Sequence, residues 1–284
     1  MIINMSSGGG GSAGKIVTVH VFYKSTVNVT CTDGKKTYTG VTDANYNVIF
    51  KLPKGIWTIT AEQDGYTSST NVNISEDCTV NISLFSATIH VSCPSGLTCK
   101  VTNGTTTLTA SGTSGVWDIV VPYAGTWVIY LNNAKAASVA ITTKGEKKTV
   151  NKWYLYKNGA DSTYLTGGLT GSGYENGSKW VFANTYIGIF PNGFGAYFGT
   201  NKKINMKNVK SVSAKATLGQ NPWNAYLHIG TSKSVNNSVG RATFSGSGDL
   251  TVSINASGIT SDCYVFIQDC TYVDIKVREI WIQC

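Results

Sequence analysis

Hydrophobic and polar residues alternate along most of the chain, in short runs separated by turn residues. In the segment VTVHV (17–21), the three valines share one face of the chain while Thr18 and His20 share the other. This period of two is typical of a β-strand with one buried face. Asp-Gly at 33–34 and Asn-Gly at 103–104 indicate hairpins, because these pairs supply the positive φ angles of tight turns. No 11-residue window has the apolar spacing of an amphipathic helix, so the pattern predicts an all-β protein.

The first half of the chain contains a strand-rich repeat. VTVHV (17–21) is echoed by ATIHV (87–91), and VIFKLPKGIWTIT (48–60) is echoed by DIVVPYAGTWVIY (118–130). Three pairs of residues stand 70 positions apart in the two copies: His20 and His90, Gly55 and Gly125, and Trp57 and Trp127. This repeat predicts two tandem, small, immunoglobulin-like β-sandwiches. Because stacked sandwiches commonly act as spacers or stalks, the repeat argues against an enzyme.

The rest of the chain is not a third copy. Nine short strand candidates in about 130 residues predict a jelly-roll-like β-sandwich. Alternation within these strands predicts that Trp180, Phe182 and Trp281 belong to its core. We therefore expect four parts: a Gly/Ser-rich leader or anchor at 1–14, immunoglobulin-like modules at 15–85 and 86–151, and the jelly-roll-like module at 152–284.

Composition favours a folded chain with few charges. Charged residues make up 13% and hydrophobic residues 42% of the sequence, and the net charge is +8. The basic residues form no long run, so we interpret them as lysines that keep strand edges apart, and we expect no nucleic-acid partner. No secretory signal peptide and no apolar stretch of membrane-spanning length is visible, which predicts no membrane insertion. A sandwich protein without an export signal fits a protein released by lysis, such as a virion part, or a chain stripped of its signal.

The seven cysteines do not form a repeated framework. Cys31 aligns with Val101 of the second copy, and Cys99 aligns with Val29 of the first. We therefore interpret most of the cysteines as small buried apolar residues. A disulfide between Cys93 and Cys99 that closes a hairpin loop is the alternative. The cysteine spacings lack the paired pattern of a zinc site.

Catalytic patterns are absent from the sequence. His20 and His90 occupy equivalent positions in different copies, so they are not expected to meet, and neither they nor His228 indicates a metal site. No pair of the 15 acidic residues stands out as the carboxylates of a glycosidase, and no Gly-x-Ser-x-Gly occurs. GGLTGSG (167–173) lacks the Lys-Ser or Lys-Thr of a phosphate loop. We predict no enzyme, no metal and no cofactor.

Aromatic residues gather between Tyr174 and Tyr226. Some fall in strands and are expected in the core, whereas others lie in or beside Gly-rich loops, where exposure is favoured. Exposed aromatic rings bind sugars by stacking on the apolar faces of pyranoses. We select four of these residues as a candidate ligand-binding face: Phe194, Tyr197, Trp223 and Tyr226.

The turn-and-strand elements LPKGIWTIT and VPYAGTWVIY resemble the short immunoglobulin-like or PEGA-like modules of bacterial surface proteins and of tail proteins of tailed bacteriophages. The Gly/Ser leader followed by such a module also resembles structural proteins of phages that infect Gram-positive bacteria. The last module, with its closing strand VDIKVREIWI (273–282), is similar to carbohydrate-binding-module sandwiches. The resemblance carries over no binding residue, because these families place them in variable loops.

Together these features lead to one hypothesis and three rivals. The leading hypothesis is a non-enzymatic virion structural protein: a tail or baseplate appendage that attaches to a host cell-surface glycan. It would be assembled in the host cytoplasm as a multimer, contact other virion proteins through the leader and first module, and be extracellular after release. The rivals are a capsid decoration protein or head fibre, a bacterial surface adhesin or polysaccharide-binding module, and a glycan hydrolase.

Overall fold

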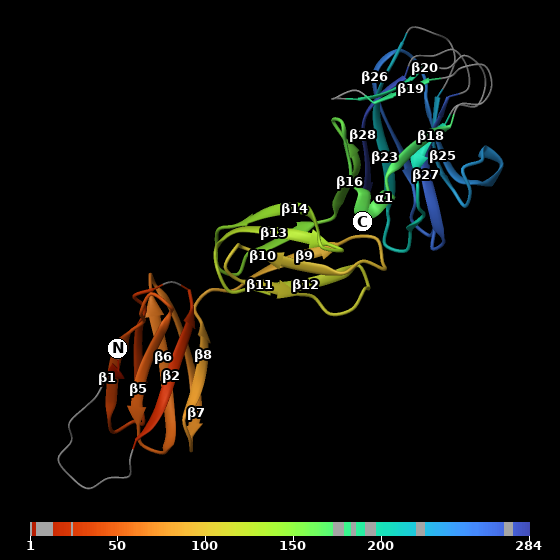
Figure 1. Cartoon of the computed structure of the whole chain (residues 1–284). Helices are drawn as coiled ribbons and strands as arrows, with labels where there is room; N and C mark the ends of the chain where they lie inside the picture. The colour runs from red at the N-terminus through yellow and green to blue at the C-terminus, as the bar shows by residue number, and fades with distance from the viewer. Residues whose placement is uncertain are drawn as a thin grey trace. The chain divides into compact units, whose positions relative to one another are not determined.

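The computed structural model of the chain describes residues 2–3, 14–23, 25–172, 179–182, 186–190, 197–219, 225–269 and 275–284. Strands follow one another through all of these segments, as Figure 1 shows from red to blue. The predicted all-β class is therefore confirmed. Among the described residues, helical structure is limited to α1 (Thr163–Thr166) and the 3₁₀ turn η1 (Val235–Asn237). Neither is long and apolar enough to cross a membrane.

The first repeat consists of two four-stranded sheets, ordered β1-β5-β2-β8 and β4-β3-β6-β7. Strand β1 lies parallel to β5 and β2 lies parallel to β8, and the other recorded pairs are antiparallel. The strands are β1 (Ile2–Ile3), β2 (Lys15–Phe22), β3 (Asn28–Thr32), β4 (Thr37–Val41), β5 (Asn47–Leu52), β6 (Gly55–Gln63), β7 (Tyr66–Ile74) and β8 (Cys78–Ser83).

These two sheets enclose one hydrophobic core. The alternation of β2 is as predicted, since Val17, Val19 and Val21 are buried in that core. His20 lies on the opposite face of the strand, where Nδ1 is 2.8 Å from the side-chain oxygen of Asn47. The alternation of apolar and polar residues in β2 therefore corresponds to one buried face and one polar face of the strand.

A buried tryptophan follows the turn between β5 and β6. Trp57 is 1% exposed, and its indole Nε1 donates a hydrogen bond to the carbonyl oxygen of Pro53 at 3.0 Å. Gly55, between them, has φ of 142°, which is accessible to glycine but strained for other residues. The second copy repeats this arrangement, with φ of 129° at Gly125 and a fully buried Trp127. The two copies therefore share a glycine turn followed by a tryptophan whose indole is buried in the core.

The second repeat has the strand order of the first. Its sheets are ordered β12-β9-β15 and β11-β10-β13-β14, which match β5-β2-β8 and β4-β3-β6-β7 strand for strand. The predicted relation between the copies is thus seen in their topology. The strands are β9 (Ala87–Ser92), β10 (Cys99–Thr102), β11 (Thr107–Thr109), β12 (Val116–Val121), β13 (Gly125–Leu131), β14 (Ala134–Ile141) and β15 (Lys147–Val150).

All cysteines within the described residues are free thiols, so the alternative of a disulfide between Cys93 and Cys99 is wrong. Both are buried, and burial raises the pKa of the Cys99 thiol to about 11. The prediction that cysteines act as buried apolar residues is confirmed for five of them, whereas Cys78 is only half-buried. Cys270 lies outside the described residues.

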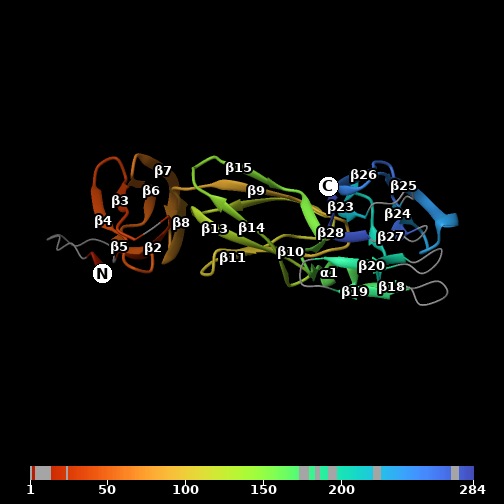
Figure 2. The ribbon, with the colours of Figure 1, turned by 90° about the horizontal axis from the view of Figure 1, so that it is seen from above.

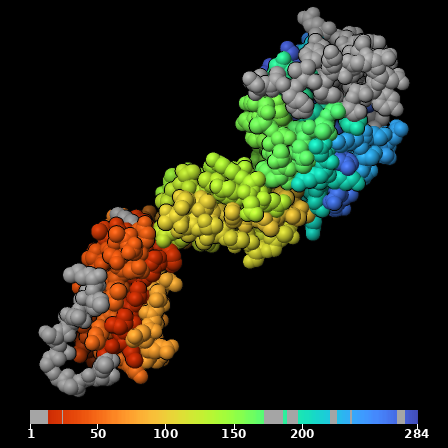
Figure 3. Space-filling view, in the orientation of Figure 1, coloured from red at the N-terminus to blue at the C-terminus, as the bar shows by residue number. Residues whose placement is uncertain are grey.

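The chain forms two compact units, whose boundary passes through the second repeat. Figure 3 shows their surfaces in the colours of Figure 1. The predicted module boundaries do not coincide with this division and stay a prediction. One unit contains residues 1–89, 120–126 and 140–148, and the other contains residues 90–119, 127–139 and 149–284.

The last module, within the second unit, consists of a seven-stranded and a six-stranded sheet (Figure 2). The larger sheet follows β17-β16-β28-β20-β19, with β23 between β28 and β26, and the smaller follows β18-β21-β27-β24-β25, with β22 beside β27. The strands are β16 (Lys152–Lys157), β17 (Ala160–Asp161), β18 (Leu169–Ser172), β19 (Lys179–Phe182), β20 (Ile187–Phe190), β21 (Tyr197–Thr200), β22 (Ile204–Asn205), β23 (Ser211–Leu218), β24 (Ala225–Gly230), β25 (Ser238–Phe244), β26 (Gly248–Asn255), β27 (Asp262–Asp269) and β28 (Ile275–Gln283).

Trp281 is not the core residue that alternation predicted. It is half-buried, and its neighbours Ile280 and Ile282 take the buried positions. The reason is an irregularity in β28, where the pairing with β23 shifts register between Lys215 and Ala216. An extra residue at such a bulge exchanges the inward and outward faces of the strand. The side chains of Trp180 and Phe182, the other two predicted core residues, lie outside the description.

Candidate ligand-binding surface

Two of the four predicted site residues lie in one row across the six-stranded sheet. Tyr197 on β21 is the register partner of Gln268 on β27, which is also the register partner of Tyr226 on β24. Register partners in antiparallel strands point to the same face, so these three side chains form a row, here called the tyrosine row. Both tyrosines are half-buried. With strands about 4.8 Å apart, the row spans about 10 Å.

The tyrosine row faces away from the core of the last module. Phe198, Leu227 and Ile267, each adjacent in sequence to a member of the row, are completely buried. Since successive side chains of a strand point to opposite faces, the row lies on the outer face of the sheet. On the same face Phe266 and His228 are buried, whereas the rings of Tyr197 and Tyr226 keep part of their surface exposed to a ligand.

Two cations lie against the rings of this face. The guanidinium carbon of Arg241 is 4.9 Å from the centroid of the Tyr226 ring. The ammonium of Lys233 is 5.9 Å from the centroid of Tyr197 and 5.3 Å from that of Tyr264. Attraction between each cation and the ring quadrupole limits the rotation of the rings. The face therefore combines fixed aromatic surface with donors for hydrogen bonds.

A buried histidine lies next to the row. His228 is 1% exposed, and its ring stacks on Phe266 with centroids 4.8 Å apart and an interplanar angle of 9°. Burial, followed by the positive charge of Arg241, lowers the pKa of His228 to about 4. The imidazole is therefore neutral at pH 7, as its position beside a cation requires.

His228 contacts two polar side chains, Ser238 and Gln268. The hydroxyl of Ser238 lies 2.8 Å from the carbonyl of Gly240, to which it donates, so its oxygen accepts from Nδ1 of His228 at 3.1 Å. Within the described part of the chain, Nε2 of His228 and the side-chain oxygen of Gln268 are buried without a hydrogen-bond partner. Both atoms are shielded from solvent, and a side-chain interaction with Gln268 raises the pKa of His228 against the two lowering effects, so these two side chains serve each other rather than a ligand.

The other two predicted site residues, Phe194 and Trp223, lie outside the described residues. In sequence they closely precede the strands that carry Tyr197 and Tyr226. Sequence analysis missed Tyr264 and Gln268, although the alternation of CYVFIQD (263–269) places both on one face. It could not have found Lys233, which approaches the rings from a loop.

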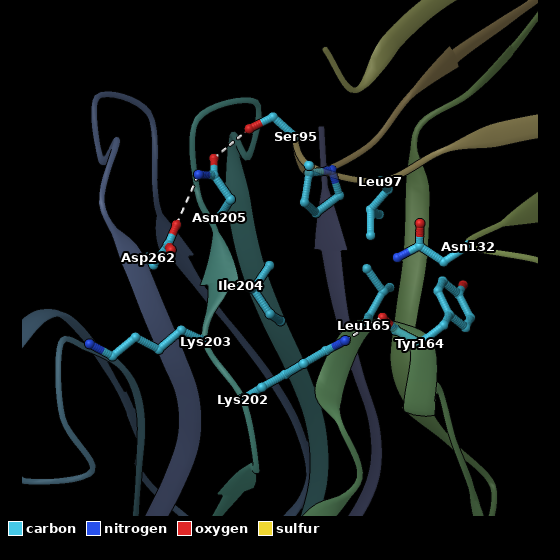
Figure 4. Close-up of a pocket in the computed structure, with 12 residues that line it drawn as sticks. Ser95, Leu97, Asn132, Tyr164, Leu165, Lys202, Lys203, Ile204, Asn205 and Asp262 are labelled. Carbon is cyan, nitrogen blue, oxygen red and sulfur yellow. Dashed lines mark hydrogen bonds between the residues drawn. The ribbon is translucent and has the colours of Figure 1, made fainter. Parts of the chain in front are cut away.

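A separate pocket of about 280 Å³ lies elsewhere in the second unit, between the loop at 94–97 and the segment at 202–205 (Figure 4). Its polar side chains are largely bonded to one another. Ser95 donates to Asn205 at 2.7 Å, and the amide of Asn205 donates to Asp262 at 2.8 Å, as the dashed lines in Figure 4 show. These bonds leave few groups for a ligand, so the pocket is a weaker candidate than the tyrosine row.

Metal ligands do not converge on this face. Across the described residues, no three or more His, Cys, Asp or Glu side chains are placed to hold a metal ion. His90, in the second repeat, has Nδ1 2.7 Å from a carboxylate oxygen of Asp118. The tyrosine row offers hydrogen bonds and aromatic surface, which suit recognition of a polar ligand.

No protein-family model and no curated protein sequence matches the chain. Its structural neighbours are carbohydrate-binding modules. A variant of the family 29 module CBM29-2 has 13% identity and a TM-score of 0.34 over 47% of this chain and 92% of its own. CBM29_1 from Piromyces equi has 12% identity and a TM-score of 0.32, and the match covers 46% of this chain and 88% of that module. The low-affinity xylan-binding module CBM86 from Roseburia intestinalis has 16% identity and a TM-score of 0.27, and the match covers 37% of this chain and 83% of that module. At these values the similarity assigns no ligand to this chain.

Proposed function

We propose that this chain is a non-catalytic carbohydrate-binding protein whose ligand lies along the tyrosine row. The observation that carries the proposal is the placement of Tyr197, Gln268 and Tyr226 side by side on three adjacent strands. Tyrosine rings offer apolar area together with a polar hydroxyl, which matches the apolar and polar surfaces of a sugar. A span of about 10 Å is comparable with two pyranose rings of an extended polysaccharide.

Polar groups around the row give this proposal its hydrogen bonds. The guanidinium of Arg241 and the ammonium of Lys233 supply donors, and the hydroxyls of Tyr197 and Tyr226 can both donate and accept. Sugar hydroxyls both donate and accept, so a carbohydrate can satisfy both kinds of group.

We also propose, as the setting for this binding, a virion appendage in which the two repeats act as a spacer and the last module contacts a host glycan. The repeated topology of the first two sandwiches supports a mechanical role, because the copies share strand order and turn geometry but differ at every cysteine. A density map of the particle tests this setting. Location in the tail or baseplate is expected, whereas hundreds of copies on the shell would indicate a capsid decoration protein or head fibre. Absence from any particle would favour a bacterial adhesin.

Replacing Tyr226 with alanine is expected to weaken polysaccharide binding about tenfold, or roughly 1.4 kcal/mol. The variant removes the ring on which the sugar stacks and leaves Arg241 without its aromatic partner. Isothermal titration of the full chain against soluble xylan, β-glucan and glucomannan measures the loss. Tyr197→Ala should behave in the same way.

Tyr130→Ala is the matched control for this experiment. Tyr130 is a half-buried tyrosine of the second repeat with the ammonium of Lys100 5.1 Å from its ring centroid, so it has the local surroundings of Tyr226 without the row. Its removal should leave binding unchanged. Equal affinity of the wild type and both row variants, or no binding to any polymer in the panel, would contradict the proposed function.

A further inference from the structure

The outer face of the seven-stranded sheet carries a second aromatic pair. Tyr154 on β16 and Trp281 on β28 are register partners, with ring centroids 6.4 Å apart at an interplanar angle of 55°. Both are half-buried, whereas the adjacent Trp153 and Ile282 are buried toward the core. The pair therefore faces away from the core on the sheet that does not carry the tyrosine row.

Two exposed lysines lie over these rings. The ammonium of Lys152 is 4.3 Å from the centroid of Trp281 and 5.0 Å from that of Tyr154, and the ammonium of Lys157 is 4.2 Å from that of Tyr154. Neither lysine forms an ion pair with a carboxylate of the described chain. A ring face attracts an ammonium but does not neutralise its charge. Lys152 pairs in register with the neutral Gln283 and Lys157 with Glu279, so the positive charge of Lys152 is fully available to an anionic ligand and that of Lys157 is partly offset.

Small hydroxyl side chains continue the row across the next two strands. Ser213 on β23 is the register partner of Trp281, and it is also the partner of Ser253 on β26. The two serine hydroxyls are hydrogen-bonded to each other at 2.7 Å. Tyr154, Trp281, Ser213 and Ser253 thus cross four adjacent strands over about 14 Å, with Ser213 buried and Ser253 exposed. These four residues with the two lysines are here called the lysine-flanked row.

We propose that the lysine-flanked row binds an acidic polysaccharide. On binding, the two ammonium groups that lie over the rings would swing aside to pair with sugar carboxylates, and a pyranose ring would take their place against Trp281 and Tyr154. The charge of the surface complements such a ligand, since the sequence as a whole carries a net charge of +8 and the two lysines face a single carboxylate across the strand pair, that of Glu279. This second site lies on a different sheet from the tyrosine row, so it does not depend on the function proposed there.

Titration of the full chain with polygalacturonate tests the lysine-flanked row. Binding is expected to weaken as salt rises, because exposed charge pairs are screened. The double variant Lys152→Gln/Lys157→Gln should bind about tenfold more weakly, as expected for the loss of two exposed ion pairs. Trp281→Ala should weaken binding by at least as much, and Trp281→Phe, which keeps an aromatic ring, should retain most of it. Fully methyl-esterified polygalacturonate, which has the same backbone without the charges, should not bind.

Three controls separate this proposal from its rivals. Lys35→Gln/Lys36→Gln makes the same change in net charge on exposed lysines of the first repeat and should leave binding intact. Tyr226→Ala should also leave it intact; a loss there would place the acidic ligand on the tyrosine row and overturn the second site. A single-stranded DNA oligonucleotide that competes as well as polygalacturonate would show a general polyanion surface and overturn the specificity for polysaccharide.

Discussion

Replacing Trp57 with alanine is expected to lower the free energy of unfolding of the first repeat by about 3–5 kcal/mol. The indole is 1% exposed in a core shared by both sheets, so its removal leaves a cavity that the surrounding strands cannot fill. The carbonyl of Pro53 also loses the hydrogen bond that it accepts from Nε1. Because small domains are stable by only about 5–15 kcal/mol, this change brings the repeat close to unfolding.

Amide hydrogen exchange of peptides from β3 and β6 measures this effect without relying on fluorescence, which the substitution itself changes. Ile56→Ala is the control, since Ile56 is the neighbouring residue of the same strand and is 70% exposed. Its effect should stay within about 0.5 kcal/mol. Trp127→Ala should destabilise the second repeat as Trp57→Ala does the first. Similar protection of β3 and β6 in Trp57→Ala and Ile56→Ala would show that the indole is not the centre of this core.

Acidification from pH 7 to pH 4 is expected to cost the last module roughly 3 kcal/mol through His228. Its pKa is lowered from 6.5 to about 4 in the folded chain, mainly by burial. Between these two values the unfolded chain takes up a proton that the folded chain does not. Stability from this group is therefore complete above about pH 6.5 and is lost as the pH falls toward 4.

His228→Phe tests this dependence. Phenylalanine keeps an aromatic ring against Phe266 but cannot take up a proton. The loss of stability between pH 7 and pH 4, followed by hydrogen exchange in β24 and β27, should be roughly 3 kcal/mol smaller in the variant. His20→Phe, in the first unit, should leave that loss unchanged. An identical pH dependence in wild type and His228→Phe would show that the imidazole is protonated in the folded chain without penalty.

The strand predictions succeeded where local pattern and burial agree. Val17, Val19 and Val21 alternate with polar residues and are buried as expected. The equivalence of Cys31 and Val101 also holds, because they pair with Ile59 and Ile129 at matching positions of the two repeats. These two predictions depend only on the two-residue period of a strand and on the similarity of the two copies, and both can be recognised in the sequence.

Trp281 shows the limit of predicting burial from the alternation of apolar and polar residues. A bulge in β28 places Trp281 on the outer face of the sheet instead of the inner one, and no residue type in the strand indicates that a bulge occurs there. Cys93 and Cys99, by contrast, are the buried free thiols that were expected of most cysteines, and only the alternative of a disulfide between them was wrong. The face of Trp281 depends on how β28 pairs with its neighbouring strands, which local sequence does not specify.

By itself, the sequence determined the all-β class, the two matching repeats and the seating of Trp57 and Trp127 after a glycine turn, because these follow from periodicity and backbone preference within a few residues. It also selected Tyr197 and Tyr226 as binding candidates. Only the tertiary structure decided that they flank Gln268 in one row and that Trp281 joins Tyr154 on the other sheet. The physical reason is that a binding face is made by register between strands distant in sequence, and register is set by the packing of the whole sandwich.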